Sequence, residues 1–279
     1  MKRSTRTVLA KATVEIVERG TYQTMGGRTI DIANAVRECL NVTRYVPIEE
    51  LEQIRNDALA LPVLGQTATI EVVNETTLAG ISRVLADGER TVLALNFASA
   101  KNPGGGFLNG SQVQEESLAR SSALHASLQR AWDFYEHHRA MLTLLYSDAM
   151  ILSPGCPIIR NDDGTLLDLP QLATFITCAA PNAGATANSR PDELPLIPEV
   201  FRRRSEYVLA LASSQGYKHL VLGAWGCGVF RNNPKVVADA FIGHLRDGIW
   251  CNRFERVVFS VFDKSPSQDT FTAFQSAMG

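Results

Sequence analysis

The sequence predicts an α/β protein in which helices cover a buried sheet. Apolar segments rich in β-branched residues alternate with segments of helical period, which is typical of strands buried on both faces. Glycine-rich or polar stretches follow these strands at their carboxyl ends, where ligands bind in such folds. The chain has 279 residues and 45% hydrophobic residues, enough to bury one large core or two modest ones.

The first third of the chain changes character near Pro62. Residues 1–62 are expected to form helices around a polar, hairpin-like stretch, "TYQTMGGRTIDI", with the last helix over 48–60. "TATIEVVN" then predicts a strand over 67–74, because it is rich in β-branched residues, and "ETTLAGISRVLAD" predicts a helix over 75–87.

Strands and helices continue to alternate to the end of the chain. "TVLALNFAS", at 91–99, is an apolar strand, and 115–139 has a helical period with a break near Trp132. The remaining predicted elements are strands at 149–155, 173–182 and 256–263, helices at 198–216 and 234–248, and a strand that runs into a glycine loop at 219–230.

Charge and cysteine content exclude several classes of protein. Lys and Arg number 27 against 29 Asp and Glu, a formal net charge of −2, so no direct DNA binding is expected. The five cysteines show no CxxC spacing, which favours reduced thiols in a cytoplasmic protein over a structural zinc site. No apolar run reaches about 18 residues, so no membrane span is expected, and the basic start reads as a helix rather than a signal peptide.

The loop after the strand at 91–99 reads "NPGGGFLNGSQVQEES". The bare backbone of Gly104–Gly106 lets a ligand approach closely and lets N–H groups converge. Glu115 and Glu116 could carry chemistry, or they could simply complement a helix dipole. The pattern is neither GxGxxG nor a Walker loop, so it predicts neither a dinucleotide site nor a P-loop.

A second glycine loop, "GAWGCGVFRNNP", joins a strand to a helix. Gly223, Gly226 and Gly228 leave backbone amides that can hold a diphosphate without a lysine. Phe230 would then lie beside the ligand, although a core phenylalanine in a simple connecting loop is equally consistent. Cys227 is explained by its small size as well as by reactivity.

The two loops together resemble the bacterial-type poly(ADP-ribose) glycohydrolase family, a catalytic branch of the macrodomain fold. The resemblance consists of the GGG run, the spacer "FLNGSQV", the QEE triplet and the downstream "GAWGCGVF". It implies a three-layer α/β/α fold with a mixed central sheet. Residues 1–62 would be an N-terminal helical extension packed on the core, and residues 63–279 a macrodomain-like catalytic domain.

The resemblance also implies roles for individual residues. Glu116 would be the catalytic acid/base, and Glu115 would bind hydroxyls of the ribose whose glycosidic bond is cut. The loop 224–229 would wrap the diphosphate, Phe230 would position the distal ribose, and Asn102 would hydrogen-bond to it. The implied substrate-binding residues are Asn102, Gly104, Gly105, Gly106, Gln114, Gly223, Gly226, Cys227, Gly228, Val229 and Phe230.

Glycosidases commonly divide acid and base work between two separated carboxylates. Glu115 and Glu116 are neighbours, so on a helix their side chains should diverge by roughly 100°. One acid/base and one ribose-binding residue is therefore the more natural assignment. No metal or cofactor is required, because the substrate's own diphosphate could stabilise the cationic transition state.

The implied substrate is poly(ADP-ribose), or an ADP-ribosylated protein, with ADP-ribose released mainly from chain ends by a monomeric enzyme. Alternatives are a macrodomain that binds ADP-ribose without cutting it, an enzyme that removes single ADP-ribose units or hydrolyses acetylated ADP-ribose, and a nucleotide-sugar enzyme. The tandem glutamates favour an enzyme over a binding module.

Two further stretches are interpreted as surface residues. Arg202–Arg204 is expected to form a solvated helix face, and His137 and His138 are expected to be exposed.

Overall fold

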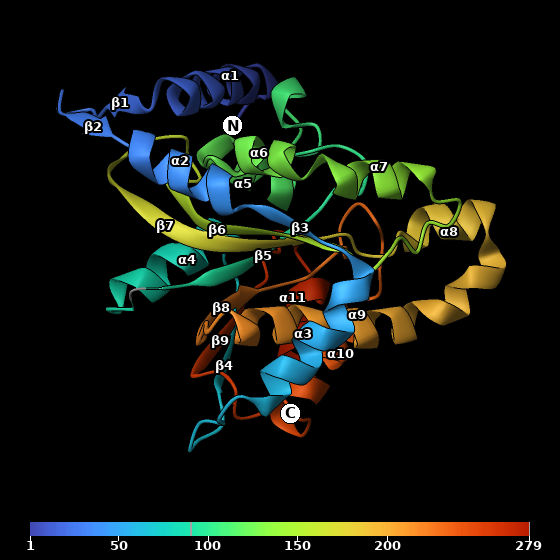
Figure 1. The fold of residues 1–279 in the computed structure, drawn as a ribbon. Coiled ribbons are helices and arrows are strands. Elements are labelled where there is room, and N and C mark those ends of the chain that lie inside the picture. Colours follow the sequence, from blue (N-terminus) through green and yellow to red (C-terminus); the bar gives the residue numbers. More distant parts are fainter. Residues whose placement is uncertain (90, 279) are drawn as a thin grey trace.

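The structure is a computed structural model that describes residues 1–89 and 91–278. Its middle layer is a seven-stranded mixed sheet in the order β3-β6-β7-β5-β8-β9-β4 (Figure 1). The β3–β6 and β6–β7 pairs are antiparallel and the other pairs are parallel. The strands are β3 (Arg44–Val46), β4 (Thr69–Val73), β5 (Leu93–Phe97), β6 (Met150–Arg160), β7 (Leu166–Cys178), β8 (His219–Leu222) and β9 (Arg256–Ser260).

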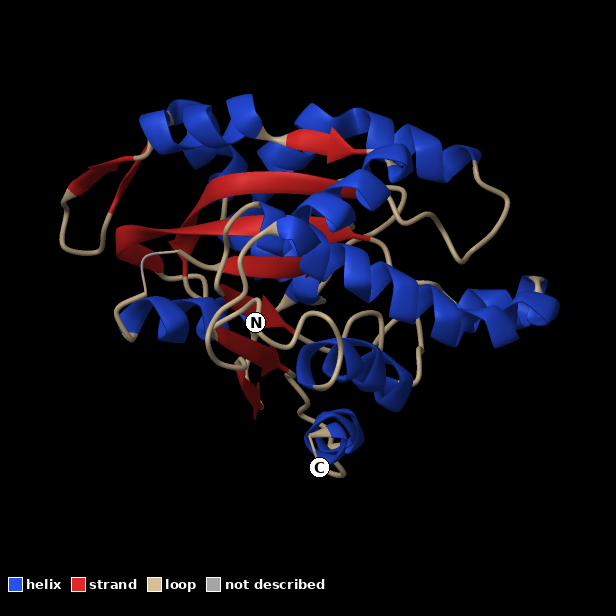
Figure 2. Cartoon of the chain, turned by 60° about the horizontal axis from the view of Figure 1, so that its bottom comes forward, coloured by secondary structure: helices blue, strands red, loops and turns tan. Residues whose placement is uncertain are grey.

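Helices cover both faces of the sheet, which confirms the predicted three-layer α/β/α architecture (Figures 1 and 2). One core cluster takes residues from α1 (Arg3–Arg19), α2 (Ala33–Val42), α4 (Thr77–Ala86), α5 (Gln114–Ser121), α6 (Leu124–Leu128) and α7 (Trp132–Ala140). The other takes them from α3 (Ile48–Ala60), α9 (Ile197–Ser214), α10 (Pro234–Arg246) and α11 (Asp269–Ala277). Successive side chains of β5 point to opposite faces of the sheet and so reach both clusters: Leu93 and Leu95 face the second cluster, and Ala94 faces the first.

The N-terminal 62 residues contain the predicted helices and the predicted hairpin, formed by β1 (Thr21–Gln23) and β2 (Thr29–Asp31). They also supply β3, which pairs with β6 at the edge of the central sheet. Helix α1 packs on the 3₁₀ turn Phe107–Asn109 and on α5, through a small buried cluster of Ala10, Phe107 and Ala119. Helix α1 is thus built into the layer that carries the tandem glutamates.

The segment 115–139 is helical but more broken than expected. Besides the break at 129–131, the helix is interrupted at Ser122, which adopts an extended conformation and forms a β-bridge with Ile158 of β6.

The predicted strands at 149–155 and 173–182 are parts of a much longer antiparallel pair, β6 and β7, of 11 and 13 residues. Two short helices, α8 (Ala183–Ser189) and α11, were not predicted.

The surface interpretation is wrong for Arg204 and His138, both of which are fully buried. Arg204 pairs with Asp148 and donates to the carbonyl oxygens of Ala179, Leu145 and Tyr146. The ring of His138 bonds to Phe134 O and to Ser147, and burial is the main reason that its pKa is lowered to about 4.

Within residues 1–89 and 91–278, no helix is both long and apolar enough to cross a membrane.

Candidate active site

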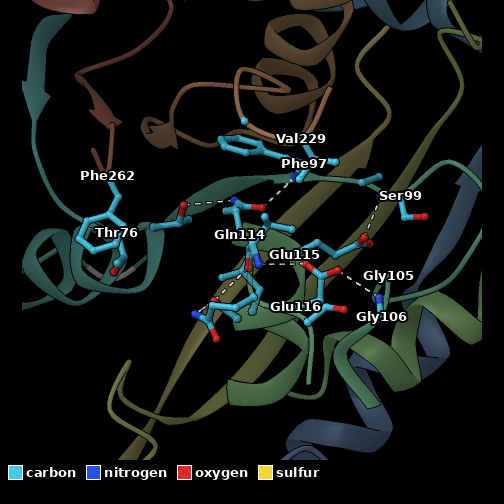
Figure 3. A pocket seen from close by; sticks show the side chains of 18 of the residues that line it. Thr76, Phe97, Ser99, Gly105, Gly106, Gln114, Glu115, Glu116, Val229 and Phe262 are labelled. Atoms are coloured by element: carbon cyan, nitrogen blue, oxygen red, sulfur yellow. Dashed lines mark hydrogen bonds between the residues drawn. The ribbon is translucent and has the colours of Figure 1, made fainter. Parts of the chain in front are cut away.

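The parallel strands β5, β7 and β8 end at the same edge of the sheet, and the chain segments that follow them enclose one large cavity. Its volume is about 1230 Å³, and it lies between the loop after β5 and the loop after β8 (Figure 3). It brings together the predicted site residues Asn102, Gly105, Gly106, Gln114, Glu115, Glu116, Gly226, Cys227, Gly228, Val229 and Phe230. Pockets at the carboxyl ends of such strands are the usual ligand sites of α/β sheets.

Two predicted site residues, Gly104 and Gly223, are not among the residues that line the cavity. A Cβ on Gly104, where φ is +68°, would lie 3.1 Å from the ring of Phe107 and 3.2 Å from Ala119. A Cβ on Gly223 would lie 2.5 Å from the carbonyl oxygen of Ser260. Both glycines therefore serve close packing behind the cavity wall.

Glu116 is held by the backbone on both of its carboxylate oxygens. Oε1 accepts a hydrogen bond from the Gly106 N–H at 3.0 Å, and Oε2 accepts one from the Val113 N–H at 3.2 Å (Figure 3). The second bond is the reach-back of a third-position glutamate to the N-cap residue of α5, one half of a capping box. Each oxygen keeps a second lone-pair direction, so the carboxylate can still exchange a proton with a ligand.

Glu115 lies deeper than Glu116, with 2% of its surface exposed against 7%. Its Oε2 accepts from the Ser99 N–H at 2.7 Å and its Oε1 from Asn96 Nδ2 at 3.3 Å. Burial first, and the neighbouring Glu116 to a smaller degree, raise the pKa of Glu115 to about 8 against the effect of these hydrogen bonds. At neutral pH this carboxyl group is therefore protonated and can both donate and accept a hydrogen bond.

The two carboxylates converge on Gly105, whose φ is +58°. A Cβ at this position would lie 2.5 Å from Glu116 Oε1 and 3.3 Å from Glu115 Oε2. The expected divergence of neighbouring side chains on a helix is thus overcome, because both side chains bend towards the same glycine. The middle glycine of the run is what allows this approach.

The raised pKa of Glu115 predicts a pH-dependent stability. Because ionisation opposes burial, the protein should lose stability as pH rises from the ordinary glutamate pKa of 4.5 to the folded value of about 8. Glu115→Gln removes this titration, so its melting temperature relative to the wild type should increase between about pH 5 and about pH 8. Thermal melts across this range test the slope, with Glu136→Gln, an exposed glutamate, as the matched control. Parallel curves for wild type and Glu115→Gln would contradict the assignment.

Gln114 joins helix α5 to the central sheet. Its Oε1 accepts from the Phe97 N–H at 2.9 Å, and its Nε2 donates to Leu95 O at 2.8 Å and to Thr77 Oγ1 at 3.1 Å. Strand β8 pairs with β5 only as far as Ala94, so the side-chain amide continues the ladder where the strand stops. Gln114 therefore positions the two glutamates that follow it.

Gln114→Ala should lower both stability and activity. It leaves a buried strand carbonyl and a partly buried N–H unpaired, so we expect the free energy of unfolding to fall by about 2–3 kcal/mol. The loosened helix start should also reduce kcat/KM by about tenfold, because small displacements of catalytic groups are costly. Urea denaturation and steady-state kinetics measure the two effects, with the exposed Gln129→Ala as control. Wild-type values for both quantities would refute the positioning role.

The loop after β8 offers unused amides to the cavity. The N–H groups of Gly226, Gly228, Val229 and Phe230 donate no hydrogen bond to any described residue. The loop is fixed from behind by Asn232, whose Nδ2 donates to Pro181 O at 2.7 Å and to Gly226 O at 3.1 Å. Clustered free amides of this kind bind anions such as phosphate oxygens.

Several of these glycines and neighbours have distinct environments. Gly226 has φ of +73°, and a Cβ there would meet Asn232 and Ala180, so a glycine is needed at this position for the turn to form. A Cβ on Gly228, by contrast, would meet no atom within 4 Å. Burial raises the pKa of the Cys227 thiol to about 12, which makes it an inert small residue rather than a nucleophile.

On the opposite side of the cavity, Asn102 is placed by Arg139 of α7. The guanidinium donates to Lys101 O at 2.9 Å and to Asn102 Oδ1 at 3.5 Å. Phe230 is half-buried and contacts the ring of Tyr146 at a centroid distance of 6.3 Å. Val229 is 70% exposed at the cavity rim.

The sequence reasoning missed four residues that hold the site from behind: Asn96, Arg139 and Asn232 through their side chains, and Ser99 through its backbone N–H. Asn96 is a fully buried polar residue inside strand β5, and a polar residue within an apolar run was the available indication. The other three residues belong to no sequence motif that could have marked them.

Over residues 1–89 and 91–278, no group of three or more His, Cys, Asp or Glu side chains is arranged to hold a metal ion.

Comparison with known proteins identifies the family. Residues 10–161 match the family model described as microbial-type PARG (poly(ADP-ribose) glycohydrolase), catalytic domain. A search of the curated proteins finds no match.

Solved structures extend the similarity over nearly the whole chain. The poly(ADP-ribose) glycohydrolase of Thermomonospora curvata is 44% identical, with a TM-score of 0.93 over 98% of this chain and 99% of that one. The structure of the same protein bound to the inhibitor ADP-HPD is 43% identical in sequence, with a TM-score of 0.90 over 98% of this chain and 99% of that one. The Deinococcus radiodurans enzyme in complex with ADP-ribose is 43% identical, with a TM-score of 0.83 over 89% of this chain and 98% of that one. The chain therefore belongs to the microbial-type poly(ADP-ribose) glycohydrolase family.

Proposed function

We propose that this enzyme hydrolyses the ribose–ribose O-glycosidic bonds of poly(ADP-ribose) and releases ADP-ribose, with Glu116 as the general acid/base. The observation that supports this most directly is the placement of Glu116. Its carboxylate is fixed by two backbone N–H groups at the wall of a cavity whose other side carries free amides suited to a diphosphate. The relatives from T. curvata and D. radiodurans bind ADP-HPD and ADP-ribose, ligands of the same class.

In the proposed reaction, Glu116 donates its proton to the glycosidic oxygen, and the bond from that oxygen to C1 of the distal ribose breaks. The leaving unit departs with a free hydroxyl group. Water then attacks C1, and the Glu116 carboxylate accepts its proton, which restores the starting state. The substrate diphosphate, bound to the amides of Gly226 and residues 228–230, offsets the positive charge that develops on the sugar.

The neighbouring residues orient the sugar in this proposal. Protonated Glu115 binds the hydroxyls of the reacting ribose, because it can donate as well as accept. Asn102 hydrogen-bonds to the same ribose from the loop after β5, and Phe230 of the loop after β8 packs against its face. We further propose a cytoplasmic, monomeric enzyme that has no cofactor and does not contact DNA, with release of monomers from chain ends.

Incubation of the purified protein with poly(ADP-ribose) tests the function, with free ADP-ribose as the scored product and EDTA expected to leave the rate unchanged. Monomer should dominate from the first time points. Early release of long free oligomers without monomer would contradict cleavage from chain ends. Binding of ADP-ribose without hydrolysis would indicate a reader module, and removal of single units from proteins with no action on polymer would indicate a mono-ADP-ribosyl hydrolase.

A further inference from the structure

The first two turns of α1 contribute Arg3 and Arg6 to the wall of the cavity. They are the only cationic side chains among the described residues that line it, whereas Glu116 and two aspartates supply the negative charge. The predicted diphosphate loop, residues 223–230, contains no charged side chain at all. The two arginines are therefore a separate feature of the cavity, which the proposed mechanism does not use.

Both guanidinium groups are fixed but not neutralised. Arg3 donates from Nε to Asn109 O at 2.9 Å, and Arg6 donates from Nε to Gly110 O at 2.7 Å. Neither forms an ion pair with any carboxylate of residues 1–89 and 91–278, in contrast to Arg83 and Arg256, which each pair with two. Arg6 also donates from Nη1 to Met1 O at 2.6 Å, whereas its Nη2 and both terminal nitrogens of Arg3 donate to no described residue. An oriented guanidinium with such unused terminal N–H groups is suited to bind phosphate oxygens.

Backbone contacts of the 106–111 loop link Arg6 to Glu116. Gly110, which accepts from Arg6, precedes Ser111, whose N–H donates to Gly106 O at 3.2 Å, and Gly106 in turn donates to Glu116. Gly110 also packs so tightly on α1 that a Cβ there would lie 2.5 Å from Arg3 O. In Figure 3, Val229 of the diphosphate loop lies on one side of Glu116, and the blue helix of the N-terminal segment lies beyond Gly105 and Gly106 on the other.

A third guanidinium braces the same turn. Arg120 follows Glu116 by one helical turn on α5 and is 4% exposed. It donates to Ser111 O at 3.2 Å and to Gln112 Oε1. Arg6 and Arg120 thus both donate to the 109–112 turn and place two positive charges on it.

We propose that Arg3 and Arg6 bind the diphosphate of the polymer unit on the leaving-group side of the cleaved bond. This inference rests on the proposed function. The oxygen that Glu116 protonates belongs to C2′ of the next adenosine, and only C3′, C4′, C5′ and O5′ separate C2′ from the next phosphorus. A polymer whose reacting ribose lies at Glu116 therefore carries its next diphosphate past the 109–112 turn, towards the two arginines. This second subsite makes the enzyme prefer polymer to single ADP-ribose glycosides.

The test compares two substrates that differ only in the leaving group. One is poly(ADP-ribose), and the other is an ADP-ribose O-glycoside with nitrophenol as leaving group, which carries no second diphosphate. For Arg3→Gln with Arg6→Gln we expect KM for polymer to rise by about a hundredfold, or about tenfold per arginine. The rise should shrink with added salt, and kcat/KM for the nitrophenyl glycoside should change by less than about twofold.

Lys11→Gln, on the exposed side of α1, removes one positive charge without touching the cavity and should leave both substrates at wild-type values. Arg3→Lys with Arg6→Lys keeps the charge and should recover most of the polymer KM. Equal losses on both substrates would overturn the proposal, because the arginines would then only brace the 109–110 turn. A loss of ADP-ribose affinity would also overturn it, since it would assign the arginines to the bound unit's own diphosphate. A wild-type protein that cleaves neither substrate would instead refute the proposed function.

Discussion

Glu116→Gln is expected to lower the turnover of poly(ADP-ribose) by at least about 10²-fold and as much as about 10⁴-fold, the usual contribution of a general acid/base. Glutamine keeps the size and one acceptor oxygen but cannot carry the proton to the leaving oxygen. Affinity for ADP-ribose should stay within about 1 kcal/mol of wild type, because binding depends mainly on the amides of the diphosphate loop. Steady-state hydrolysis and calorimetry with ADP-ribose measure the two quantities.

The same carboxylate also caps α5 through the Val113 N–H, so Glu116→Gln should cost about 1 kcal/mol of stability. A thermal melt separates this modest effect from the loss of turnover. Glu115→Gln should behave differently: it should weaken the hold on the reacting ribose and reduce turnover through misplacement. Glu136→Gln, on the surface of α7, controls for the loss of a carboxylate. Full activity in Glu116→Gln would end the proposed mechanism.

Arg204→Ala is expected to lower the free energy of unfolding by about 3–5 kcal/mol, which is typical of removing one partner from a buried ion pair. The change removes the guanidinium group that pairs with the buried Asp148 carboxylate. It also leaves the buried carbonyl oxygens of Ala179 and Leu145 without their hydrogen-bond donor. Burial alone would raise the pKa of Asp148, but the guanidinium groups of Arg204 and Arg203 hold it below its usual value. The stabilisation from this pairing is therefore present at neutral pH and lost as the solution is acidified.

Arg202→Ala is the matched control, because Arg202 lies two residues earlier on α9 with a side chain 56% exposed and an ion pair to Glu199. Exposed pairs of this kind contribute about 0–1 kcal/mol, so its unfolding curve should nearly overlay the wild type. Arg204→Lys, which keeps the charge but not the planar fork, should fall between the two. Urea denaturation decides the order, and equal curves for Arg202→Ala and Arg204→Ala would contradict the structural assignment.

The sequence was sufficient for the architecture and for the centre of the cavity. Apolar strands such as 91–99 and 219–222 are local patterns, and the glycine runs that follow them mark where backbone must approach a ligand. The carboxyl ends of β5 and β8 meet by the geometry of a parallel sheet, so two loops more than a hundred residues apart could be predicted to share one site.

The rest depends on contacts that leave no local pattern. Arg204 sits in a run of three arginines on an apparently polar helix face, and only the packing of α9 on the sheet buries the last of them. The length of β6 and β7 was hidden by prolines and by register shifts within the pair. The convergence of Glu115 and Glu116 on Gly105 likewise arises from a fold of the loop, not from helical geometry.

The edge position of β3 bears on how this enzyme can be shortened or tagged. Without residues 44–46, the antiparallel edge of β6 would present unpaired backbone N–H and C=O groups, the arrangement that promotes edge-to-edge aggregation. Trimming the chain to its catalytic portion would thus add Met150–Leu152 of β6 to the exposed edge of the sheet. Residues fused before Met1 would also lie close to the cavity, because the carbonyl oxygen of Met1 accepts a hydrogen bond from Arg6, which lines it. Affinity tags belong at the other end of the chain, beyond α11.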